Sequence, residues 1–147
     1  MFATPAMPSF DLEQSWPKCY AAFLEYLSEL TASRLATLRL ATLGPTGTPS
    51  AELAATLLAT VIKTKKFASE CVLCTSYERA FASMLVGESD LFLVENAYEG
   101  AFRFYHSPRA FLLLSFMQEL PRQTRKAKPA FPPQRSWALF APTRTNL

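Results

Sequence analysis

The chain has 147 residues, of which 50% are apolar and 18% are charged, and its formal net charge is +3. This length fits one domain, or one domain with a tail. The apolar fraction excludes a wholly disordered protein, because enough hydrophobic surface exists to offset the entropy lost on folding. The charged fraction is below the roughly 25% of an average soluble domain. This composition indicates a subunit whose apolar surface is covered by partner proteins.

Charge is distributed unevenly along the chain. Residues 1–120 carry nine basic and all twelve acidic residues, for a net charge of −3, whereas residues 121–147 carry six basic residues and no acid. We therefore divide the chain into an extended lead-in over residues 1–14, a helical domain over residues 15–120 and a basic tail over residues 121–147. The tail is rich in proline and aromatic residues, and we expect it to be extended.

Helical periodicity dominates the first half of the domain, so we expect a mainly α fold. Residues 15–17 are typical of a helix start, and apolar residues at helical spacing follow until Gly44. Thr48 and Pro49 repeat the start signal for a second helix that ends near residue 68. The short link between them predicts an antiparallel αα-hairpin over residues 16–68.

Three further elements are expected in the second half of the domain. Residues 75–78 match a capping box, which predicts a third helix that ends at Gly87. Residues 91–105 combine a short apolar run with a period-two segment, which fits a β-hairpin or a helix. Residues 108–119 are apolar on nearly every side, so we expect a last helix that is central in the core or covered by a partner.

Cys71 and Cys74 form the one CxxC pattern of the chain. A structural zinc site needs four ligands, and only Cys19 and His106 could complete this pair, without the spacing of a known motif. A redox pair would need an exposed thiol with a lowered pKa, whereas Val72 and its neighbour Leu73 indicate apolar surroundings. We therefore expect buried structural cysteines and no cofactor.

No catalytic constellation stands out in the sequence. His106 is the one histidine, and Ser107 beside it is explained as a helix N-cap rather than as a nucleophile. With four glycines in the chain, there is no glycine-rich loop that could hold phosphate groups. The sequence predicts a protein that is not an enzyme.

Targeting signals are also absent from the sequence. No apolar run reaches the roughly 18–20 residues of a membrane-spanning helix, and residues 1–9 lack the charged and apolar regions of a secretory signal. Three cysteines cannot form a closed disulfide framework. We expect a protein that does not span a membrane, in a reducing intracellular compartment, with a mitochondrial location favoured.

The tail carries the positive prediction about function. Its aromatic residues are expected to fill pockets on neighbouring proteins, and its basic residues are expected to act as an electrostatic clamp. These partner-binding candidates are Arg122, Arg125, Lys126, Lys128, Phe131, Arg135, Trp137 and Phe140. They predict a non-catalytic structural or accessory subunit of a large multi-protein assembly.

RNA is the alternative partner of the tail. In this reading the chain is a ribosomal-type assembly protein, and its basic residues contact rRNA phosphates. Residues 121–147 could also bind anionic lipid. The net negative charge of residues 1–120 argues for protein over RNA, because nucleic-acid modules present a broad basic face.

Overall fold

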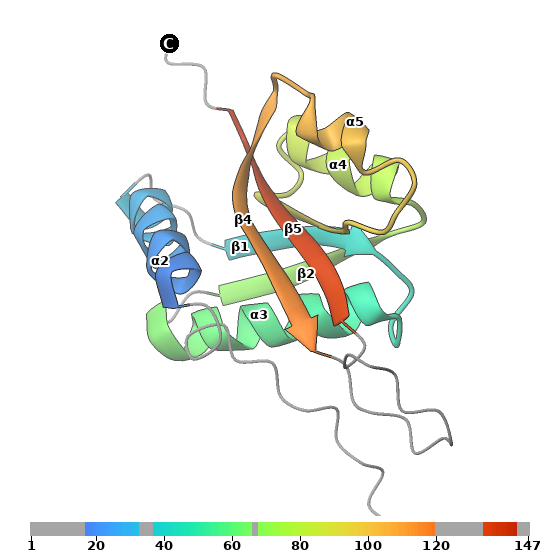
Figure 1. Cartoon of the computed structure of the whole chain (residues 1–147). Helices are drawn as coiled ribbons and strands as arrows, with labels where there is room; N and C mark the ends of the chain where they lie inside the picture. Colours follow the sequence, from blue (N-terminus) through green and yellow to red (C-terminus); the bar gives the residue numbers. More distant parts are fainter. Residues whose placement is uncertain (1–16, 33–36, 66–67, 120–133, 144–147) are drawn as a thin grey trace, which may run out of the picture.

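Five strands form one mixed sheet in the order β2-β1-β3-β5-β4. The computed structural model describes residues 17–32, 37–65, 68–119 and 134–143 (Figure 1). In chain order the elements are α2 (Pro17–Ala32), β1 (Thr37–Leu43), α3 (Pro49–Lys65), β2 (Ala68–Cys74), α4 (Tyr77–Leu85), β3 (Leu91–Glu95), α5 (Phe102–Tyr105), β4 (Ala110–Glu119) and β5 (Gln134–Pro142).

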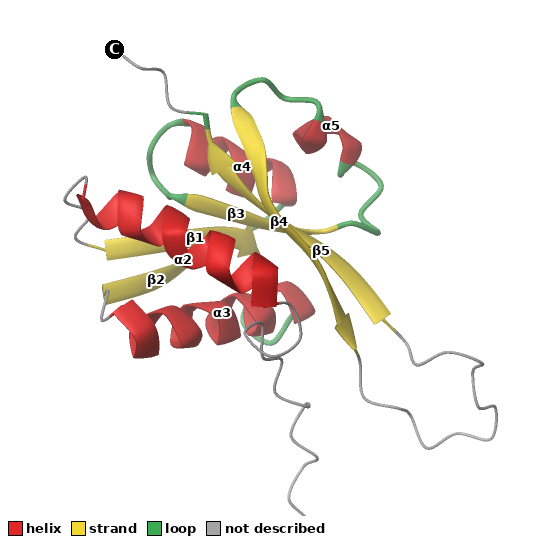
Figure 2. Ribbon diagram, turned by 60° about the vertical axis from the view of Figure 1, so that its left-hand side comes forward, coloured by secondary structure: helices red, strands yellow, loops and turns green. Residues whose placement is uncertain are grey.

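The strand directions divide the sheet into two halves. β1 pairs in parallel with both β2 and β3, whereas β5 pairs antiparallel with both β3 and β4. α3 connects β1 to β2, and α4 connects β2 to β3 in the opposite direction along the sheet. Since such crossovers are right-handed, opposite directions place the two helices on opposite faces. Figure 2 shows α2 and α3 on one side of the sheet and α4 and α5 on the other.

Each face of the sheet has its own apolar core. The core under α2 and α3 includes Phe23, Leu27, Leu57, Leu93 and Trp137. The core under α4 and α5 includes Tyr77, Met84, Phe92, Phe104 and Phe140. Successive residues along β3, and likewise along β5, therefore point into different cores, because side chains alternate between the two faces of a strand.

The mainly α fold expected from the sequence is wrong. Residues 37–43, read as the end of the first helix, form β1, and residues 110–119, read as a last helix, form β4. Residues 91–95 form a strand, but it pairs with β1 and β5 rather than in a hairpin with residues 102–105, which form one helical turn. Residues 110–114 are apolar on both faces of the strand, so β4 lacks the alternation that distinguishes a strand from a buried helix.

Two helix starts predicted from local signals are confirmed. α3 begins at Pro49, and the hydroxyl of Thr48 accepts a hydrogen bond from the amide of Ala51. α4 begins at Tyr77, where Ser76 accepts from the amide of Arg79, so the cap lies one residue after the first residue of the predicted box. These signals depend on neighbouring residues alone, which is why the sequence shows them.

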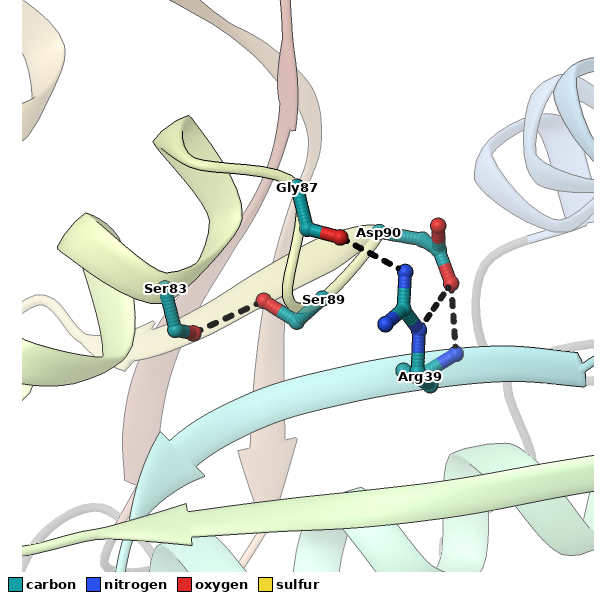
Figure 3. A network of polar contacts seen from close by, with 5 residues as sticks. All are labelled: Arg39, Ser83, Gly87, Ser89 and Asp90. Atoms are coloured by element: carbon teal, nitrogen blue, oxygen red, sulfur yellow. Dashed lines mark hydrogen bonds and ion pairs between the residues drawn. The ribbon is translucent and has the colours of Figure 1, made fainter.

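An ion pair joins Arg39 on β1 to Asp90, the residue that precedes β3 (Figure 3). The Asp90 carboxylate accepts from the backbone amide of Arg39 at 2.8 Å and lies 3.4 Å from the Arg39 Nε atom. The guanidinium also donates to the carbonyl of Gly87 at 2.9 Å. The hydroxyl of Ser83 on α4 is hydrogen-bonded to the hydroxyl of Ser89 in the turn, at 2.9 Å. These contacts hold the α4–β3 turn against β1.

Replacing Trp137 tests whether β5 belongs to the core. The side chain is 0% exposed, so Trp137→Ala is expected to lower the free energy of unfolding by about 3–5 kcal/mol. Phe102 is 58% exposed, and the matched variant Phe102→Ala is expected to cost less than about 1 kcal/mol. Urea unfolding followed by circular dichroism measures both. Equal stability of the two variants would show that Trp137 does not pack in the core.

Replacing Asp90 tests the contact between β1 and the α4–β3 turn. Asp90→Ala is expected to lower the free energy of unfolding by about 1–2 kcal/mol, because the amide of Arg39 loses its acceptor. Asp90→Asn keeps an acceptor oxygen and removes the charge, so its loss is expected to be smaller. The same unfolding assay ranks the two variants, and an equal loss would assign the whole effect to the charge.

Candidate functional site

The residues predicted to bind partners do not form one exposed site. Trp137 and Phe140 are 0% and 1% exposed and lie inside the cores of the chain itself, so they are not accessible anchors. The Nε atom of Arg135 lies 3.7 Å from a carboxylate oxygen of Glu95. The other predicted positions lie outside the described residues: Arg122, Arg125, Lys126, Lys128 and Phe131.

The two cysteines of the CxxC pattern lie on β2 and face opposite sides of the sheet. Cys71 packs against the core under α2 and α3, and Cys74 packs against the core under α4 and α5. A spacing of three along a strand produces this separation. Burial is the main cause that raises the pKa of both thiols, and the Glu70 carboxylate also raises that of Cys71. This geometry does not bring the two sulfurs together.

His106 and Ser107 also lack a catalytic arrangement. His106 is exposed at the end of α5, and the hydroxyl of Ser107 accepts a hydrogen bond from the amide of Arg109 at 3.3 Å. Within the described residues, no group of three or more His, Cys, Asp or Glu side chains could hold a metal ion.

The carboxyl ends of β1 and β3 are where ligands bind in many open α/β sheets. Here the polar side chains near that edge bond to one another. The hydroxyls of Ser50 and Tyr77 are 2.5 Å apart, and the hydroxyl of Tyr98 donates to the Glu78 carboxylate at the same distance. Burial raises the pKa of Tyr77, and the hydrogen bond to Glu78 raises that of Tyr98. The hydroxyls of Ser50, Tyr77 and Tyr98 therefore each have a hydrogen-bond partner within the protein.

An aromatic cluster holds the short helix α5 against the sheet. The ring of Phe104 lies 4.8 Å from those of both Phe81 and Phe92, measured between centroids. The ring of Tyr105 packs edge-to-face on Phe140 at 5.1 Å, and its hydroxyl donates to the side chain of Asn96. The position of α5 is therefore determined by packing on both of its sides.

Large apolar side chains lie exposed on α5 and on the neighbouring strand β4. We call this region the α5–β4 surface, and its members are Phe102 (58% exposed), Tyr105 (41%), Leu112 (41%) and Met117 (40%). Leu112 pairs with Phe140 across the strands, and Tyr105 lies on Phe140, so strand and helix contribute to one area. The exposed residue Arg103 lies on α5, and its guanidinium lies 5.9 Å from the centre of the Phe102 ring.

A shallow groove lies on the opposite face of β4, between this strand and α2. We call it the α2–β4 groove. Its volume is about 340 Å³, and it is lined by Ala22, Glu25, Tyr26, Glu29, Phe111 and Thr143. Phe111 is 41% exposed and packs edge-to-face on Tyr26, with 6.0 Å between the ring centres. The groove therefore has an aromatic floor and two exposed carboxylates at its rim.

Both surfaces were missed in the sequence because they depend on β4 being a strand. Phe111 and Leu112 are consecutive, and only a strand directs consecutive side chains to opposite faces. The one signal available was the apolar character of residues 110–117 on nearly every side, which indicated a segment that is central in the core or covered by a partner.

Comparison with protein-family models, with curated proteins and with solved structures finds no match to this chain. Among the helices that the structure describes, none combines the length and the apolar character needed to cross a bilayer. The function must therefore be argued from the surfaces themselves.

The thiols of Cys71 and Cys74 offer a test of the described geometry. Because burial raises the pKa of both groups, less thiolate is present at neutral pH than for a free cysteine. Alkylation by iodoacetamide is expected to be slow in the folded protein, to accelerate as pH rises and to reach the rate of a free thiol in urea. Mass spectrometry of the two peptides measures the rates. Fast alkylation at neutral pH without denaturant would contradict this packing of the two half-buried cysteines.

Proposed function

We propose that the chain is a non-catalytic structural subunit of a protein assembly and that the α5–β4 surface is where a neighbouring subunit docks. The observation that carries this proposal is the exposure of four large apolar side chains, each 40–58% exposed, on the neighbouring elements α5 and β4. Monomeric soluble proteins rarely expose contiguous apolar patches above a few hundred Å². Covering such a patch with a partner removes this surface from water.

The energetics favour protein as the occupant. Burying one large apolar side chain completely stabilises a complex by about 1.5–3 kcal/mol, and two such residues, Phe102 and Leu112, stand at the centre of the proposed contact. Because α5 is held by the aromatic cluster and β4 by pairing with β5, docking requires little ordering of the backbone. The position of Arg103 beside Phe102 matches the enrichment of arginine at protein interfaces.

RNA is the second candidate partner. The exposed Phe102 ring with the Arg103 guanidinium beside it resembles the stacking platforms that hold bases, and the basic residues at 122–128 would add phosphate contacts. Nuclease treatment and a salt series separate the two candidates. A partner that is lost with nuclease, or whose retention falls steeply with salt, is RNA-dependent.

The proposal is tested by capturing the tagged full chain from the cells in which it is natively made. Phe102→Asp and Leu112→Asp are expected to lower the ratio of neighbouring proteins to the chain by about tenfold or more, because a charge cannot enter an apolar contact. Val86→Asp is the matched control, since Val86 is 68% exposed but lies at the end of α4, outside the α5–β4 surface.

Thermal unfolding of each purified variant shows whether the fold is retained. If Phe102→Asp keeps the wild-type melting temperature and also the wild-type set and amount of neighbours, the α5–β4 surface is not a docking site. Quantitative mass spectrometry of the captured proteins gives the ratios.

A further inference from the structure

We draw no further inference here: the strongest candidate, the apolar side chains exposed on both faces of the outer strand β4, belongs in part to the docking surface already described, and nothing in the structure shows what covers the rest.

Discussion

The pairing of β3 with β5 is the constraint on which the rest of the structure depends. It is the one junction between the parallel half of the described sheet and its antiparallel half. The paired residues are almost completely buried, with Phe92 opposite Phe140 and Leu93 opposite Leu139. Since buried backbone groups must find hydrogen-bond partners, β5 cannot leave this position without exposing both cores to water. One face of the junction builds the core under α2 and α3, and the other face builds the core under α4 and α5.

This junction places β4 at the edge of the sheet, where its composition is unusual. Edge strands are commonly protected by charged residues or proline, but β4 is apolar from Ala110 to Leu114 and again at Phe116 and Met117. A β-bulge between Leu112 and Leu114 is the one protective device that its pairing with β5 shows. An edge strand with the composition of a central strand is consistent with a chain whose surface is completed by another protein, which is the basis of the proposed function.

The fold determines where the charged residues of the chain lie in space. The body has a net charge of −3 along the sequence, but its charges lie in separate places. The exposed residues Glu25 and Glu29 lie on α2, and the exposed residue Arg103 lies on α5, on the other side of the sheet.

The sequence by itself determined the helix starts at Pro49 and Tyr77, the helix end near Gly87 and the apolar character of residues 110–117, because each depends on neighbouring residues. It did not determine whether an apolar segment becomes a strand or a buried helix, so β1 and β4 were read as helices. Nor did it show that Trp137 and Phe140 fill the cores. Only the tertiary structure decided these points, because a strand exists through hydrogen bonds to partners distant in the chain, and the sequence shows no alternation where both faces of a strand are apolar, as in β4.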